Sequence, residues 1–304
     1  MKIVFAGSPQ FAADALAEIA NHHDVAMVLT MPDSPVGRKR VLTPTPVATA
    51  ANELGLEVRK LRGFSHELIE ELAQSDVEAG VVIAFGVLVP QKALQLFSWI
   101  NLHYSLLPMW RGASPLQQSI LHGTGQGFTI FELDEGMDTG PVLSSKELSY
   151  PPDKTSGELL PYVTELGTQA LLKVLDGDLS RAVQVGEPTL APKLKRTDAR
   201  VRFQESADQI HRKVMAFNPE PMAWCELGDE PFRILRSRSL GATDWNGLGG
   251  SDLLPGQLEV CQGRVLVGCG AGTRLELLQV QPAGKKPMGA LDWYRGQSPE
   301  VRLG

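Results

Sequence analysis

Two polar side chains at the end of an apolar segment have the types and the spacing that catalysis requires. Asn101 and His103 end the segment "LFSWINLH" (96–103). Alternate residues of a β-strand point to the same face, and the carboxyl end of a parallel strand opens onto the crevice where α/β sheets bind ligands. An amide donor beside an imidazole suits an oxyanion that develops at a carbonyl carbon. Spacing alone favours the alternative, a strand-end Asn and a His packed in the core.

A carboxylate that could act with this histidine follows in the segment "DEGMDTGPV" (134–142). Gly136 and Gly140 mark a tight turn around Asp138. Acidic residues in such turns often only close the turn. Beside a strand-end histidine, however, Asp138 could hold the imidazolium and serve as a base.

Two basic clusters lie in segments that are typical of loops. The segment "PDSPVGRKRVLTPTPV" (32–47) is expected to be a long loop, and loops of more than about 12 residues are usually functional or disordered. The segment "QPAGKKPMGA" (281–290) follows another expected strand. The basic residues are Arg38, Lys39 and Arg40 in the first segment and Lys285 and Lys286 in the second. Both clusters suit phosphate contact; the alternative is a solvated, charged loop tip.

The elements that must position these residues alternate between strands and helices. The expected strands of the first part are 2–7, 24–30, 56–61, 77–86 and 96–103. Segment 66–74 is expected to be a helix, and Ser8 and Pro9 are expected to cap and begin another. Two later strands, within 127–150, are expected to pair. The alternation predicts an α/β fold with a Rossmann-like, mostly parallel sheet.

The character of the sequence changes after this first part. Residues 1–185 are expected to form one domain, and the Pro-, Thr- and charge-rich segment 186–204 a linker. Residues 205–304 contain a helical segment and then short apolar runs with turn signals between them. This pattern predicts a smaller antiparallel β-barrel or sandwich.

Several classes of protein are disfavoured. The sequence contains no G-x-G-x-x-G, no G-x-x-x-x-G-K-[ST] and no G-x-S-x-G motif. No window of about 18 apolar residues predicts a membrane span, and no Cys and His pairs have the spacing of a metal site. Three Cys without a C-x-x-C favour a reduced, cytoplasmic compartment. A net charge of -6 makes nucleic-acid binding dependent on local patches.

Taken together, these motifs resemble the methionyl-tRNA formyltransferase family. "FAGSPQFAA" (5–13), "AFGVLVP" (84–90), "NLHYSLLPMWRGASPLQQSI" (101–120) and "DEGMDTGPV" are similar to its core motifs. The Asn-x-His, Ser-Leu-Leu-Pro and Asp-Thr-Gly set is shared by the wider group that uses 10-formyltetrahydrofolate. The basic loop, "AFNPEPMAW" (216–224) and "LQVQPAGKKPM" (278–288) narrow the resemblance to the tRNA enzymes.

The resemblance implies a formyltransferase fold with an oligonucleotide-binding-barrel (OB-like) second domain. It implies formyl transfer from 10-formyltetrahydrofolate to the α-amino group of initiator Met-tRNA, without a metal. Asn101 and protonated His103 would stabilise the tetrahedral oxyanion, and Asp138 would pair with His103 and relay a proton. The residues that would frame the folate are Phe85, Gly86, Leu88, Val89, Ser105, Leu106, Leu107, Pro108, Glu135, Gly136 and Met137.

The resemblance also implies a monomer whose basic residues contact tRNA. Arg38, assisted by Lys39 and Arg40, would approach the acceptor stem, and the second domain would use Lys285 and Lys286. Some positions depart from the family pattern. Ser34, Val41, Met109 and Glu220 make the expected tRNA path less positive, and Lys39 stands in place of a Gly.

Three rival functions remain open on the sequence. A formyl-group enzyme that acts on a small amine, such as a sugar, would keep Asn101, His103 and Asp138 but would not need this second domain. An inert tRNA-binding module would not need the three residues. A formyltetrahydrofolate hydrolase typically has a regulatory domain before the catalytic one, and here the catalytic motifs begin at Met1.

Overall fold

The chain folds into two compact units, each described by itself. The computed structural model describes residues 1–37, 39–177, 180–241, 253–298 and 300–304. The first unit comprises Met1–Pro115, Gly125–Ser149 and Leu160–Ala191, and the second comprises Leu116–Thr124, Tyr150–Leu159 and Pro192–Gly304. The predicted bounds 1–185, 186–204 and 205–304 for domain, linker and domain remain a proposal.

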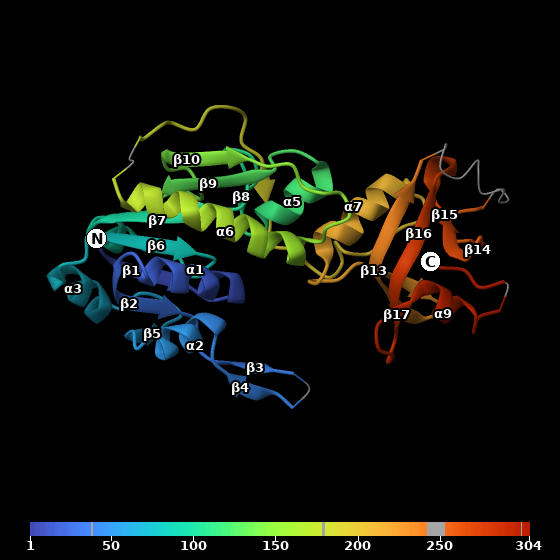
Figure 1. Cartoon of the computed structure of the whole chain (residues 1–304), viewed down its shortest axis with the longest axis horizontal. Coiled ribbons are helices and arrows are strands. Elements are labelled where there is room, and N and C mark those ends of the chain that lie inside the picture. Colours follow the sequence, from blue (N-terminus) through green and yellow to red (C-terminus); the bar gives the residue numbers. More distant parts are fainter. Residues whose placement is uncertain (38, 178–179, 242–252, 299) are drawn as a thin grey trace. The chain divides into compact units, whose positions relative to one another are not determined.

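A seven-stranded sheet forms the centre of the first unit (Figure 1). In spatial order its strands are β10 (Val142–Glu147), β9 (Gly127–Glu132), β7 (Ser98–His103), β6 (Ala79–Ile83), β1 (Lys2–Gly7), β2 (Asp24–Thr30) and β5 (Val58–Lys60). The strands from β7 to β5 are parallel, whereas β9 and β10 are antiparallel at one edge. The predicted mostly parallel sheet and its later strand pair are confirmed.

Helices cover both faces of this sheet, as buried parallel strands require. The helices are α1 (Gln10–Ala20), α2 (Pro46–Glu53), α3 (His66–Gln74), α4 (Gln91–Leu94) and most of α6 (Ser156–Leu175). On one face, Leu68 and Leu72 of α3 pack with Val82 and Trp99. On the other face, α6 lies so close to β7 that a Cβ added at Gly167 would be 2.6 Å from Leu102.

A close contact between β6 and β7 fixes the position of β7, the strand that carries Asn101 and His103. Gly80 pairs with Trp99 across the two strands, and a Cβ added at Gly80 would be 2.3 Å from the indole ring. The Trp99 Nε1–H donates to the carbonyl of Ala93, 2.9 Å away. Because side chains alternate along a strand, Asn101 and His103 lie on the Trp99 face of the sheet.

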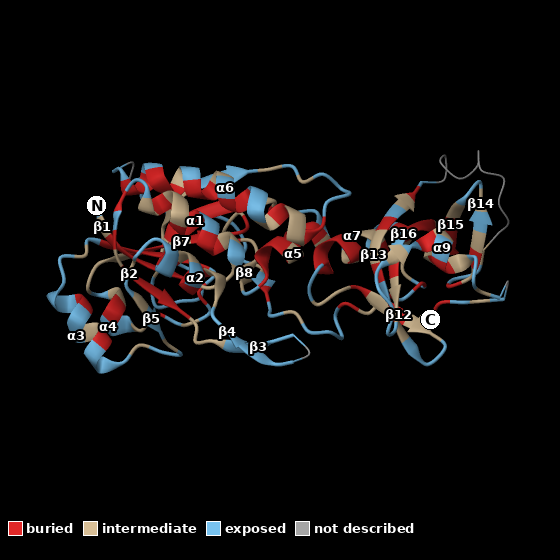
Figure 2. Cartoon of the chain, turned by 60° about the horizontal axis from the view of Figure 1, so that its bottom comes forward, coloured by how far each residue is buried: buried red, intermediate tan, exposed pale blue. Residues whose placement is uncertain are grey.

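Two local predictions for the first unit were wrong. Ser8 does not cap α1, because Pro9 holds the N-cap position and the Ser8 hydroxyl donates to the carbonyl of Phe85 instead. The expected long loop 32–47 contains a hairpin of β3 (Ser34–Val36) and β4 (Val41–Thr43). The hairpin projects from the sheet in Figure 1, and Figure 2 shows it exposed.

Two short strands tie a later segment to the first unit. Strand β8 (Arg111–Gly112) pairs in parallel with β11 (Leu190–Ala191). The Thr189 hydroxyl oxygen accepts a hydrogen bond from the Trp110 N–H at 2.8 Å. Residues 189–191 therefore hold the turn that follows β7.

The second unit is built on an antiparallel sheet. Its strands are β12 (Trp224–Leu227), β13 (Glu230–Leu240), β14 (Leu258–Cys261), β15 (Arg264–Gly268), β16 (Arg274–Pro282) and β17 (Met288–Gly289). Helices α7 (Ala207–Phe217) and α9 (Ala290–Tyr294), nearly all of α5 (Pro115–His122) and the short 3-10 helix η1 (Gly270–Gly272) complete it. A capping box of Ser206 and Gln209 starts α7. The prediction of a smaller antiparallel β domain is confirmed.

No helix among the residues that the structure describes has the length and hydrophobicity needed to cross a membrane.

Candidate active site

A cavity of about 660 Å³ opens in the first unit at the carboxyl ends of β6 and β7. Asn101, His103 and Asp138 all line it. Of the predicted folate-framing residues, those that line it are Phe85, Gly86, Leu88, Val89, Glu135, Gly136 and Met137. The structure thus brings together two segments, 84–89 and 133–138, that are far apart in the sequence.

The His103 ring is buried and held by one hydrogen bond. It is 4% exposed, and its Nε2 lies 2.9 Å from the carbonyl oxygen of Trp110. Because a carbonyl can only accept, Nε2 carries the hydrogen, and the neutral ring has its lone pair on Nδ1. The Phe131 ring meets the imidazole edge to face, with 6.1 Å between ring centroids.

Asp138 lies on the Nδ1 side of this imidazole. Its Oδ2 is 3.8 Å from His103 Nδ1 and accepts a hydrogen bond from the backbone N–H of Gly112 at 2.7 Å. The backbone of Asp138 is left-handed, with a φ of 55°, a conformation that Asp tolerates better than most residues. The carboxylate is therefore directed at the nitrogen that can gain or lose a proton.

The pKa of His103 is lowered from its ordinary value of 6.5. Burial is the main cause, while the charge of Asp138 and the hydrogen bond to Trp110 oppose it. This direction favours the neutral form of the resting ring at neutral pH, and the protonated His103 that the motif resemblance implies remains a proposal. A neutral ring with a free Nδ1 is a proton acceptor.

Asn101 presents a free carboxamide to the cavity. It is half-buried on β7, paired with Val82 on one side and Phe131 on the other. Within the described part of the chain, its side chain makes no hydrogen bond to protein. A half-buried amide in this state is a ready donor to a ligand oxygen.

The predicted folate-framing turn 105–108 lies outside the cavity lining. Ser105 is fully buried, and its hydroxyl donates to the Met109 carbonyl at 2.6 Å. Its own carbonyl accepts from the Thr129 hydroxyl, whose oxygen accepts from the Leu107 N–H. Leu106 donates its N–H to Gly125 and Pro108 is buried. This turn fixes the path of the chain from His103 to Trp110.

The other predicted framing residues form the wall of the cavity. Phe85 is 2% exposed and belongs to the core beneath, whereas Leu88 and Met137 are 86% and 61% exposed. Exposed apolar side chains beside a cavity suit contact with a ring-shaped ligand. Glu135 is held by a hydrogen bond from the side chain of Gln91.

Three contributors to the site escaped the sequence interpretation. The carbonyl of Trp110, the N–H of Gly112 and the side chain of Gln184 each hold His103 or the turn of Asp138. The backbone groups carry no signal in residue type. Gln184 is the polar residue between two valines in "AVQVG" (182–186). This pattern does not indicate which residues Gln184 contacts.

The predicted tRNA-binding residues fall in both units. Arg38 lies outside the described residues. Lys39 and Arg40 are exposed in the turn of the β3–β4 hairpin. Lys285 and Lys286 are exposed in the segment between β16 and β17 of the second unit.

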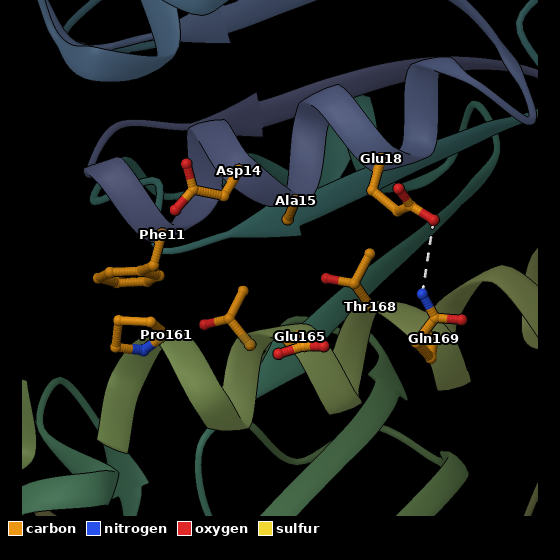
Figure 3. Close-up of a pocket in the computed structure, with 9 residues that line it drawn as sticks. Phe11, Asp14, Ala15, Glu18, Pro161, Glu165, Thr168 and Gln169 are labelled. Atoms are coloured by element: carbon orange, nitrogen blue, oxygen red, sulfur yellow. Dashed lines mark hydrogen bonds between the residues drawn. The ribbon is translucent and has the colours of Figure 1, made fainter. Parts of the chain in front are cut away.

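A second cavity in the first unit, of about 250 Å³, lies between α1 and α6 (Figure 3). Asp14, Glu18 and Glu165 line it, and the Gln169 amide donates to Glu18 across it at 3.5 Å. It contains none of the predicted catalytic residues. Nor do the described residues contain a group of His, Cys, Asp or Glu that could hold a metal ion. The larger cavity is thus the candidate active site.

The sequence matches known families along most of its length. Residues 1–175 match the family model "Formyl transferase", and residues 193–298 match "Formyl transferase, C-terminal domain". The chain belongs to the formyl transferase family. This membership confirms the family that the sequence motifs indicated.

Two curated members of the formyl transferase family align with the chain from end to end. The methionyl-tRNA formyltransferase of Leifsonia xyli subsp. xyli is 40% identical, with 100% of both chains covered. That of Arthrobacter sp. (strain FB24) is 42% identical, with 98% of this chain and 97% of the relative covered.

A solved structure shares the formyl transferase fold. The N-formyltransferase from Helicobacter canadensis, in complex with folinic acid and dTDP-3-aminofucose, gives a TM-score of 0.67 at 17% identity. The comparison covers 93% of this chain and 99% of that protein. At this identity the likeness establishes the fold and leaves the acceptor substrate to other observations.

Proposed function

We propose that this formyl transferase family member transfers the formyl group of 10-formyltetrahydrofolate to the α-amino group of initiator Met-tRNA. The products are N-formylmethionyl-tRNA and tetrahydrofolate. The observation that carries the chemistry is the convergence of Asn101, His103 and Asp138 in one cavity. The end-to-end similarity to methionyl-tRNA formyltransferases supports the acceptor.

The geometry supports a defined sequence of proton and electron movements. The substrate amine attacks the formyl carbon, the carbonyl electron pair moves onto oxygen, and the Asn101 amide donates a hydrogen bond to this oxyanion. Collapse of the intermediate re-forms the carbonyl and breaks the bond from carbon to N10 of the folate. The amine loses one proton and N10 gains one.

His103 and Asp138 account for that proton. The neutral imidazole accepts it at Nδ1 and delivers it to the leaving nitrogen. Between these steps the ring is positive, and the Asp138 carboxylate, 3.8 Å away, stabilises it. The hydrogen bond to Trp110 keeps the ring in one orientation throughout.

The cavity suits a folate as the formyl donor. Its volume of about 660 Å³ lies in the ordinary range for sites that take drug-sized ligands. The exposed side chains of Leu88 and Met137 would supply apolar contact above the buried Phe85 and Val89, and the backbone of 84–89 and 133–138 would supply polar groups. Ser105 to Pro108 would act by supporting the cavity.

Basic residues of both units would bind the tRNA. Arg38, Lys39 and Arg40 would contact the acceptor stem, and Lys285 and Lys286 would contact another part of the phosphate backbone. Ser34, Val41, Met109 and Glu220 add no positive charge to these surfaces. The affinity for tRNA would fall with salt in proportion to the number of phosphate contacts. We place the enzyme in the cytoplasm as a monomer.

A comparison of two acceptor substrates tests this function. The protein is incubated with 10-formyltetrahydrofolate and either initiator Met-tRNA or a dTDP-linked amino sugar, and the formylated product is measured. We expect formylmethionyl-tRNA at catalytic enzyme concentrations and none with His103→Asn. Transfer to the amino sugar with no formylation of Met-tRNA would favour the small-amine rival and overturn the proposal.

A further inference from the structure

Gln184 has an unusual exposure pattern for a residue in a surface segment. Its neighbours Val183 and Val185 are 84% and 87% exposed, whereas Gln184 is half-buried. Polar side chains are ordinarily the exposed ones and valines the buried ones. The segment therefore turns its polar residue inward, which indicates that the contacts of this side chain determine its conformation.

Both ends of the Gln184 carboxamide are used. Its Nε2 donates to the carbonyl of Asp138 at 2.8 Å and to the carbonyl of Gly140 at 2.8 Å. Its Oε1 accepts from Arg111, at 3.2 Å from Nε and 2.6 Å from one terminal nitrogen. One side chain thus joins two turns that lie in different parts of the sequence.

These contacts close a ring of interactions around the candidate catalytic pair. The residues on either side of Arg111 hold the pair itself: the Trp110 carbonyl binds His103, and the Gly112 N–H binds the Asp138 carboxylate. Gln184 connects Arg111 to the backbone of Asp138. The imidazole and the carboxylate are consequently fixed relative to each other through one three-residue segment.

We propose that Gln184 is a positioning residue that sets the Asp138 carboxylate against His103. Asp138 has a left-handed backbone, with a φ of 55°, which a non-glycine residue adopts at a cost unless its surroundings enforce it. Two hydrogen bonds to carbonyls 138 and 140 supply that enforcement. The catalytic consequence rests on the proposed function, but the positional consequence does not.

Two substitutions separate the contacts of Gln184. Gln184→Ala removes all of them. Gln184→Glu keeps the shape and the acceptor for Arg111, but an ionised carboxylate cannot donate to the two carbonyls. If the bonds to carbonyls 138 and 140 are the important ones, both variants lose the alignment of Asp138. The matched controls are Gln169→Ala and Gln169→Glu, because Gln169 also bonds through its amide in the first unit but lies away from the larger cavity.

Kinetics give the first measurement. We expect a fall in kcat of about tenfold to a hundredfold for both Gln184 variants, since small misplacements of catalytic groups have costs of this size. The KM for both substrates should change little, because Gln184 is not among the residues that line the cavity. In an Asp138→Asn background, Gln184→Ala should lower kcat no further. Additive losses in the double variant, or a kcat equal to that of the Gln169 controls, would overturn the proposal.

Titration of His103 by NMR gives a second measurement that does not require turnover. The charge of Asp138 raises the pKa of His103 against the effect of burial. Loss of alignment in Gln184→Ala should therefore lower this pKa, while Gln169→Ala leaves it unchanged. An unchanged His103 titration in folded Gln184→Ala and Gln184→Glu would contradict the positioning role. Failure of the wild type to formylate Met-tRNA, with this shift present, would instead count against the proposed function alone.

Discussion

The Nε2 atom of His103 donates a hydrogen bond to the carbonyl oxygen of Trp110, and the two atoms are 2.9 Å apart. This bond leaves Nδ1 as the titrating nitrogen, on the side where the Asp138 carboxylate lies. The direction in which protons enter and leave the ring is therefore set by a main-chain group seven residues away.

The pH dependence of catalysis tests this arrangement. The pKa of His103 is lowered from 6.5, chiefly by burial, and the neutral ring is the proposed base. Protonation of His103 should therefore reduce activity only below pH 6.5. Asp138→Asn removes a charge that raises the pKa, so the acidic decline should move to still lower pH as kcat falls. The measurement is kcat/KM against pH for both proteins. An acidic decline that Asp138→Asn leaves in place would be inconsistent with His103 as a buried, neutral base.

Because the carboxamide of Asn101 is free, we expect its removal to lower the reaction rate without lowering the stability of the fold. Asn101→Ala removes the proposed oxyanion donor, and such losses typically lower kcat by about 10²–10³-fold. The midpoint of thermal unfolding should stay close to that of the wild type, because this carboxamide has no hydrogen-bond partner among the described residues. The two measurements are single-turnover kinetics and a thermal melt. A large drop in the melting temperature would instead identify Asn101 as a structural residue.

The contact between Gly80 and Trp99 predicts a loss of stability far larger than the added methyl group suggests. A Cβ at Gly80 would lie 2.3 Å from the indole, and overpacking in a core typically costs about 1–3 kcal/mol. Gly80→Ala should lower the free energy of unfolding by this amount in urea. At Gly63 an added Cβ meets no atom within 4 Å, so Gly63→Ala is the matched control. Equal changes in the free energy of unfolding for the two substitutions would show that β6 and β7 can move apart without loss of stability.

The basic cluster 38–40 should affect tRNA binding and leave folate binding unaffected. Replacing Arg38, Lys39 and Arg40 by Ala should raise the KM for Met-tRNA and leave the KM for 10-formyltetrahydrofolate nearly unchanged. Each lost phosphate contact should also reduce the slope of log affinity against log salt by roughly 0.7–0.9. Lys173→Ala, on an exposed position of α6, controls for general loss of charge. An unchanged salt slope would remove these three residues from the tRNA interface.

Local signals explain which parts of the fold the sequence predicts well. Helix α3 occupies His66–Gln74, the same range that the sequence predicts, because the Ser65 side chain caps it and its buried residues Leu68 and Leu72 follow the helical period. The expectation for Ser8 failed because its hydroxyl bonds to Phe85, a partner 77 residues away. Partners at such distances are set by tertiary structure and are absent from local patterns.

The same distinction applies to the site. Asn101 and His103 could be placed in one cavity because a two-residue spacing puts both on one face of a strand. Asp138 could be added because the segment around it is a recognisable motif. Gln184 could not be assigned to the site from the sequence. Its role depends on hydrogen bonds to the backbone carbonyls of residues 138 and 140, which residue types do not reveal. Nor could the lowered pKa of His103 be predicted, because its burial depends on the packed structure.

The pairing of β8 with β11 has a consequence for how the enzyme matures. A ribosome releases the chain from its N-terminus, so Asn101, His103 and Asp138 emerge well before the segment of Gln184, Thr189 and Ala191. That later segment supplies the bonds that hold residues 110–113 and the turn of Asp138. A nascent chain that ends at residue 175 would thus contain Asn101, His103 and Asp138. It would still lack the hydrogen bonds that align them. We therefore expect the site to become aligned only once a segment that contributes no reactive atom has joined the first unit.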